Sequence, residues 1–162
     1  MSKILRAGLG ALLGLACAPV LAGTATTTFT VTATVAAACT ISATNLAFGT
    51  YSETAAPPTD GSSTVTTTCT KAAAYDIGLN AGGGTGATVA ARKMTSGANL
   101  LTYSLFQDAA RAVVWGNTIG TDTVALVGTG LTVPTTVFGR IPALQNVAVG
   151  SYTDTITATV TF

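Results

Sequence analysis

The 162-residue sequence has no histidine and few charged residues. Without histidine, Ser-His-Asp and Cys-His catalysis and most zinc sites are excluded. The six acidic residues are scattered and form no close pair in the sequence of the kind that a glycosidase needs. The sequence therefore offers no candidate catalytic residue, metal ligand or cofactor site, and we expect a protein that is not an enzyme.

The first 22 residues have the pattern of a secretory signal peptide. Lys3 and Arg6 accompany an apolar run at 4–15, and small or apolar residues end at Ala22. The run is too short to span a bilayer. We predict cleavage after Ala22; a lipidated N-terminus at Cys17 is a weaker alternative, because the residues before it match a lipobox only loosely.

Charge is also scarce, since only 8% of the residues are charged and 48% are hydrophobic. Folded domains usually have about a quarter of their residues charged. Removal of Lys3 and Arg6 leaves five basic residues against six acidic ones, a net charge near −1. A chain this close to neutral has no electrostatic attraction for nucleic acid or anionic lipid, so we expect neither as a partner.

Cleavage after Ala22 leaves two cysteines, Cys39 and Cys69. In an exported chain such a pair predicts a disulfide, because the compartment is oxidising; two free thiols are the alternative. By loop-closure entropy, a bridge over this length of chain stabilises the fold by roughly 3–4 kcal/mol.

Two segments alternate between apolar residues and threonine, which is typical of strands with one buried face. In the first, from 28 to 35, the apolar positions are Phe29, Val31, Ala33 and Val35. In the second, from 152 to 162, they are Tyr152, Ile156, Ala158, Val160 and Phe162.

Further short strands are predicted between these two segments. They lie at 39–43, 46–51, 64–70, 75–80, 100–107, 112–115, 124–131 and 135–141. Turn-type runs separate them at 57–61, 81–86, 108–110 and 116–120. No helical stripe follows the signal peptide. Many short strands with one disulfide indicate an all-β fold, an immunoglobulin-like antiparallel sandwich.

Three local features have ordinary structural interpretations. Gly82–Gly86 lacks the Gly-Lys-Ser/Thr ending of a phosphate-binding loop and is expected to be a flexible hairpin connection. Arg92–Lys93 is expected to be a solvated strand end. Trp115 is expected to be a core anchor or edge cover, with ligand stacking as the alternative.

The last predicted strand reaches Phe162, with no later segment to pair with it. A sandwich of this class normally has one more strand there. Its absence would expose an apolar groove and unpaired backbone groups. The sixteen residues 23–38 precede the first domain cysteine and can extend over roughly 50 Å. Their alternating part, Thr24–Val35, fills either the groove of its own domain or that of another copy, and periodicity does not distinguish the two.

A set of short motifs also lies in order along the mature chain. They are Cys39–Ala43, Leu46–Tyr51, Cys69–Thr70 with Tyr75–Leu79, Arg92–Met94, Leu101–Asp108, Trp115–Gly116, Val137–Pro142 and Gly150–Phe162. In order and spacing this set resembles the spore coat protein U domain family, which includes subunits of Csu-type archaic chaperone–usher pili. The loop after Trp115–Gly116 departs from the family pattern, because it lacks a glycine-rich continuation.

The resemblance implies an incomplete immunoglobulin-like pilin domain at 39–162 that lacks its final strand. A periplasmic chaperone would supply that strand, and an outer-membrane usher would exchange it for the extension 23–38 of the next subunit. The donor side chains would be Phe29, Val31, Ala33 and Val35, and the family's disulfide would join Cys39 to Cys69. The strand bordering the acceptor groove and docking on the chaperone would carry Tyr152, Ile156, Ala158, Val160 and Phe162.

The expected function is therefore structural. The chain would pass through the periplasm to the cell surface and join other copies or related pilins in a pilus or fimbria that supports adhesion and biofilm formation. With one domain and a donor-like extension, a shaft or minor subunit fits better than a tip. The alternative is a spore or cell-surface coat protein that folds as a self-complemented monomer.

Overall fold

The computed structural model describes residues 21–162, so most of the predicted signal peptide lies outside the described residues. The chain divides into two units, with the boundary between Thr34 and Val35. Residues 21–34 contain no helix or strand. Across residues 21–162, no helix is long and apolar enough to cross a lipid bilayer.

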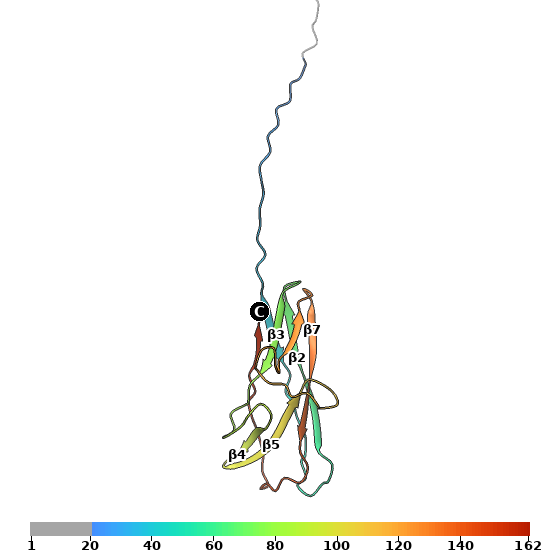
Figure 1. The fold of residues 1–162 in the computed structure, drawn as a ribbon, viewed down its shortest axis with the longest axis vertical. Coiled ribbons are helices and arrows are strands. Elements are labelled where there is room, and N and C mark those ends of the chain that lie inside the picture. Colours follow the sequence, from blue (N-terminus) through green and yellow to red (C-terminus); the bar gives the residue numbers. More distant parts are fainter. Residues whose placement is uncertain (1–20) are drawn as a thin grey trace, which may run out of the picture. The chain divides into compact units, whose positions relative to one another are not determined.

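The second unit is built from eight strands. They are β1 (Cys39–Ala43), β2 (Thr59–Cys69), β3 (Ala74–Leu79), β4 (Arg92–Ser96), β5 (Asn99–Phe106), β6 (Val124–Val127), β7 (Thr132–Ile141) and β8 (Ala158–Thr161). All pairings are antiparallel. One sheet has the order β1-β2-β7-β5-β4 and the other β6-β3-β8 (Figure 1). The predicted immunoglobulin-like sandwich lacking its final strand is confirmed.

The core lies between the two sheets because one face of each long strand is apolar. On β5, alternate residues Leu101, Tyr103 and Leu105 are buried, and on β3 Ile77 is fully buried. Each large apolar side chain of this kind contributes about 1.5–3 kcal/mol when buried. The hydroxyl of Thr67 on β2 pairs with that of Tyr75 on β3, 2.9 Å away, and so satisfies polar groups inside the core.

Trp115 is an anchor of this core, as predicted. Its side chain is fully buried, and its indole Nε1 donates a hydrogen bond of 2.8 Å to the carbonyl oxygen of Ile77. Its backbone N–H donates to Leu105 O on the opposite sheet, 2.9 Å away. The residue therefore connects both sheets and leaves no exposed ring for ligand stacking.

The prediction of a solvated end at Arg92–Lys93 is wrong for Arg92. Its side chain is fully buried, and its guanidinium donates to four backbone carbonyls at 2.7–3.0 Å. Burial lowers the pKa of this guanidinium. Lys93 is half-buried and donates to Thr85 O at 3.2 Å. The buried arginine is tolerated because its fork of N–H donors reaches several carbonyls at once.

Several predicted boundaries differ from the structure. Residues 46–51 form no strand, and 112–115 form only a single bridge, between Val114 and Phe106. Strand β4 was not predicted at all. Strand β2 begins at Thr59, inside the run predicted to be a turn, because its register with β7 continues to that residue.

The segment after β1 is irregular because it packs across the sheet instead of joining it. Gly61 and Gly139 lie opposite each other on β2 and β7. A Cβ atom at Gly61 would lie 3.1 Å from Leu46 and Phe48, and one at Gly139 would lie 2.8 Å from Phe48. The glycine pair therefore makes the space that Leu46 and Phe48 occupy.

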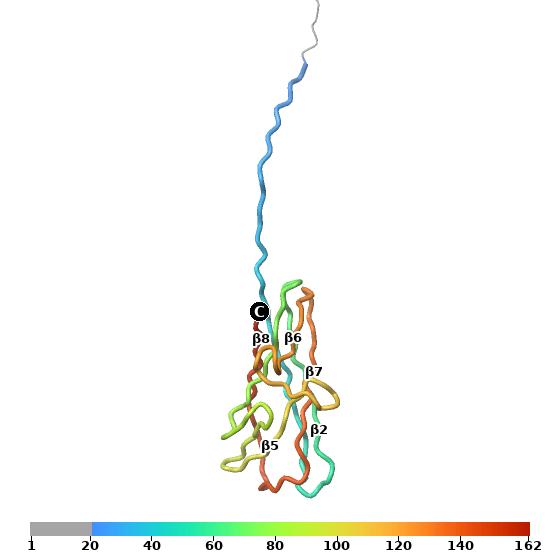
Figure 2. The backbone as a smooth tube through the Cα atoms, viewed as in Figure 1, coloured from blue at the N-terminus to red at the C-terminus, as the bar shows by residue number. Residues whose placement is uncertain are grey.

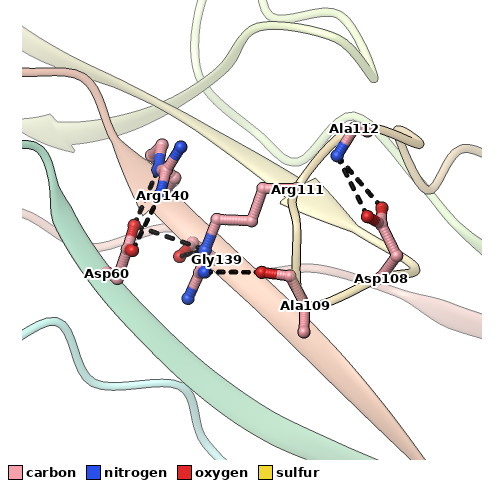
Figure 3. A network of polar contacts seen from close by, with 7 residues as sticks. All are labelled: Asp60, Asp108, Ala109, Arg111, Ala112, Gly139 and Arg140. Carbon is pink, nitrogen blue, oxygen red and sulfur yellow. Dashed lines mark hydrogen bonds and ion pairs between the residues drawn. The ribbon is translucent and has the colours of Figure 1, made fainter.

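A polar network fixes the outer side of this sheet (Figure 3). Arg140 donates two hydrogen bonds to Asp60, at 2.7 and 2.9 Å, and Arg111 lies 3.3 Å from the same carboxylate. The hydrogen bond from Arg140 is the main cause that lowers the pKa of Asp60. Arg111 also donates to Gly139 O, so the 108–113 loop is tied to β2 and β7.

Candidate strand-binding groove

Two sheet edges face each other across one side of the sandwich. Among the described residues, β1 pairs only with β2 and β8 pairs only with β3. Several Cα atoms of β1 lie within 8 Å of Cα atoms of β8. Each strand therefore turns a row of unpaired backbone N–H and C=O groups toward the same opening.

A groove of about 520 Å³ lies at this opening. Ala43–Leu46 and Phe48 form one wall, and Tyr152–Ile156 with Ala158 form the other. The floor is made by core side chains of both sheets: Val65, Leu79, Met94, Tyr103, Leu105 and Val137, with Ser63. Packed protein interiors have few voids larger than a water molecule, so a space of this size makes the groove a candidate binding site.

The second wall is an extended segment that is only partly paired. Exposure alternates from Tyr152 to Thr161, as the sequence predicts, but the regular strand begins only at Ala158. Thr153 and Thr95 of β4 exchange two backbone hydrogen bonds, at 2.8 and 3.1 Å. Figure 2 shows this segment in orange to red, running into β8. The predicted strand 152–162 is thus shorter than expected because, before Ala158, its backbone bonds to other segments at separated positions, Thr153 with Thr95 and Thr157 with Asn80.

Asp154 holds this wall in place. One carboxylate oxygen accepts a hydrogen bond of 2.7 Å from the Tyr103 hydroxyl, and the other accepts one of 2.8 Å from the backbone N–H of Gly83. Burial, with the bond to Asp154, raises the pKa of Tyr103, so its hydroxyl stays protonated and remains a donor. Gly82 has a φ of +81°, and a Cβ atom there would overlap the Asp154 carboxylate. The glycine run is therefore a connection between β3 and β4, shaped by this contact.

The disulfide fixes β1, the strand that leads into the first wall at Ala43. Cys39 and Cys69 are bonded, with an S–S distance of 2.01 Å, and lie opposite each other in the β1–β2 ladder. The predicted disulfide is confirmed. It attaches the edge strand β1 covalently to the sheet at the end where β1 begins.

The structure separates the predicted groove residues into two sets. Tyr152, Ile156 and Ala158 line the groove. Val160 is half-buried outside the lining, and Phe162 is 57% exposed. Sequence reasoning missed the first wall and the floor; the alternation of Leu46 and Phe48 was the available signal.

The four predicted donor residues lie in no strand. Phe29, Val31 and Val35 are 86%, 81% and 83% exposed, and Ala33 is exposed as well. The strand predicted at 28–35 is therefore absent from the described structure. Alternation decides which side chains share a face, but a strand also needs the edge of a neighbour to pair with.

Comparisons with known proteins agree with this architecture. Residues 25–159 match the Spore Coat Protein U domain family. Protein U of Myxococcus xanthus is 38% identical over 159 residues, covering 89% of this chain and 88% of that protein. A similar fold occurs in the crystal structure of the CsuC–CsuE chaperone–tip adhesion subunit pre-assembly complex from archaic chaperone–usher Csu pili of Acinetobacter baumannii. The TM-score is 0.56 at 24% identity, and the match spans 80% of this chain and 40% of that one.

Proposed function

Because the chain belongs to the Spore Coat Protein U domain family, we propose that it is a structural subunit of a surface fibre, a pilus or fimbria. In this proposal the segment 23–38 of one copy, or of a related subunit, completes the groove of the next. The subunits would thereby be joined head to tail through backbone pairing.

The open groove carries this proposal. A strand laid into it would lie between the two walls, Ala43–Leu46 and Tyr152–Ile156, and would pack on the apolar floor. The donor face from Phe29 to Val35 spans seven residues, and the groove wall from Tyr152 to Ala158 spans seven as well. At about 3.3 Å per residue, both are roughly 20 Å long. The exposed donor side chains therefore match the groove wall in length and the apolar groove floor in chemistry.

The assembly route is proposed from the same site. A groove with two free edges is an aggregation hazard until it is filled. A periplasmic chaperone would fill it first, docking on the segment that holds Tyr152, Ile156, Ala158, Val160 and Phe162, and an outer-membrane usher would then exchange the chaperone for the donor segment. The similar fold in a chaperone–subunit complex supports this order. The finished fibre would lie at the cell surface and support adhesion and biofilm formation.

The test is gel electrophoresis of the purified mature protein, without boiling and without reductant. Strand-exchanged polymers resist dissociation, so we expect a ladder of oligomers. Deletion of residues 23–35 should abolish the ladder. A deletion variant that retains the ladder would overturn the proposal.

A matched pair of variants makes the test specific for the donor face. Val31→Asp places a carboxylate in the groove, where burial of an unpaired charge costs several kcal/mol. Thr32→Asp adds the same charge at the next residue, on the opposite face of the segment. We expect Val31→Asp to abolish the ladder and Thr32→Asp to retain it; equal loss in both variants would contradict insertion of the apolar face.

A coat protein of spores or cells is the second candidate. It is favoured by the family's description and by the Myxococcus xanthus relative, which matches over most of its length. In that case the segment 24–35 would fill the groove of its own domain. The gel would then show a folded monomer that the deletion destabilises.

A further inference from the structure

The connection between the donor segment and β1 carries an inference that rests on the proposed function. Three alanines, Ala36–Ala38, precede Cys39 and lie beside Thr70 at the end of β2. The N–H of Thr70 donates to Ala38 O at 2.9 Å, and the N–H of Ala38 donates to the Thr70 hydroxyl oxygen at 3.1 Å. That hydroxyl also lies 3.3 Å from Ala38 O and 3.5 Å from Ala36 O, either of which accepts its proton.

The side chain of Thr70 takes the place of a backbone carbonyl here. The β1–β2 ladder ends at the pair Cys39–Cys69. Beyond it the chain turns away, with Ala72 at a φ of 66°, and Thr70 O accepts a hydrogen bond of 3.1 Å from the N–H of Ala73. Because that carbonyl is engaged in the turn, the hydroxyl accepts from Ala38 and extends the ladder by one residue.

This arrangement opposes a return of the segment into its own groove. To pair with the free edge of β1, residues 24–35 would have to form a hairpin with β1. A two-residue turn at Ala36 and Ala37 would be closed by a hydrogen bond from the N–H of Ala38 to Val35 O, but that N–H is donated to the Thr70 hydroxyl. Two-residue hairpin turns require positive φ angles and therefore favour glycine, asparagine and aspartate. The alanines are strained in that conformation because of their Cβ atoms.

The geometry points to a clasp, formed by Thr70 and the run Ala36–Ala38, that prevents the donor segment from completing its own domain. The segment is thereby kept available for a second copy, whose groove it enters without a hairpin turn. Thr70 acts as a positioning residue, since it holds the backbone of the connection and does not line the groove.

The test uses the full mature chain and turn variants of the connection. Ala36→Asn with Ala37→Gly introduces the preferred sequence of a tight hairpin turn. Thr70→Val keeps the shape of the side chain and removes both hydrogen-bonding roles of the hydroxyl. The matched controls are Ala36→Ser with Ala37→Ser, which adds polarity without a turn preference, and Thr68→Val, which removes another hydroxyl of β2.

We expect the ladder of the wild type to be replaced by monomer when the turn substitutions and Thr70→Val are combined, with at least a tenfold rise in the monomer fraction at equal concentration. Both controls should keep the wild-type ladder. In the combined variant, adding Val31→Asp should lower the melting temperature of the monomer, because the segment now completes its own domain. If Thr70 only stabilised the fold, its replacement would lower the melting temperature without changing the ratio of monomer to polymer.

The two proposals fail in different ways. If the wild type forms a ladder and the combined variant forms the same ladder, the clasp is refuted while the fibre proposal stands. If the wild type itself is a folded monomer that deletion of residues 23–35 destabilises, the fibre proposal fails, and the clasp is refuted with it.

Discussion

Replacement of Arg92 by methionine tests how the buried guanidinium supports the fold. The side chain donates to the carbonyl oxygens of Leu79 and Trp115, both in buried surroundings, and to those of Asn80 and Val89, in partly buried ones. Methionine fills similar space but supplies no donor. The substitution therefore leaves these oxygens short of partners.

The expected loss follows from the two buried carbonyls. Each buried acceptor without a partner costs about 1–3 kcal/mol, so the two cost about 2–6 kcal/mol. Removal of the desolvated charge offsets part of this loss. We expect Arg92→Met to lower the free energy of unfolding by about 3 kcal/mol, which lowers the melting temperature by roughly 10 °C for a domain of this size.

The assay is thermal unfolding followed by circular dichroism, with Lys93→Met as the matched control. Lys93 is the adjacent basic residue, half-buried, with one exposed hydrogen bond to Thr85 O, and its replacement should change stability by less than about 0.5 kcal/mol. Arg92→Lys should fall between the two, because an ammonium lacks the planar fork of donors. Equal melting temperatures for Arg92→Met and Lys93→Met would show that the guanidinium hydrogen bonds do not stabilise the domain.

Three further predictions concern the loops, the polar network and the disulfide. Gly82→Ala should lower the melting temperature of the domain more than Gly97→Ala. Both glycines have positive φ, but of these two positions only Gly82 would place a Cβ atom against the Asp154 carboxylate of the groove wall. Equal losses of melting temperature in the two variants would contradict this. Asp60→Asn should lower stability at pH 7 by less than about 1 kcal/mol, because the site is partly exposed. Since the hydrogen bond from Arg140 holds the pKa of Asp60 below its usual 3.8, the contribution is present above that pH and is lost as pH falls below it. The difference in melting temperature between wild type and Asp60→Asn should therefore shrink as pH falls below 3.8; a difference that stays constant over that fall would refute the assignment. Replacement of Cys39 by serine opens a bridge between residues 30 apart and should cost roughly 3–4 kcal/mol in chemical denaturation; a loss below about 1 kcal/mol would contradict it.

The sandwich was predictable because period-two alternation is a local signal. On β5, Leu101, Tyr103 and Leu105 alternate with polar or half-exposed residues, and all three are buried. Strand length was less predictable, as the segment before Ala158 shows: its side chains alternate in exposure, but a strand forms only where a second backbone pairs with it.

Burial of Arg92 was not predictable from its neighbours in the sequence. Arg92–Lys93 resembles an ordinary solvated pair. The carbonyls that accept from the guanidinium belong to Leu79, Val89 and Trp115, among others, and meet only when three separate segments are packed together. A buried cation depends on such long-range partners, so local composition carries no signal for it.

The groove was predictable on one side only. The alternation ending at Phe162 indicated a strand that borders an unfilled site. The opposite wall depends on Leu46 and Phe48 crossing the glycine pair Gly61 and Gly139, which are brought together by the β2–β7 register. Such a register is set by the whole sheet, and no local pattern encodes it.

Hydrogen exchange of the assembled oligomers tests whether residues 24–35 of one copy occupy the groove of the next. Peptides covering 24–35 and 152–161 would be compared between the oligomers of the wild type and the monomer of Val31→Asp, by mass spectrometry. We expect both segments to gain protection together in the oligomers, because the donor segment and the groove wall pair with each other. Oligomers in which residues 24–35 exchange as fast as in the monomer would contradict donor-strand assembly.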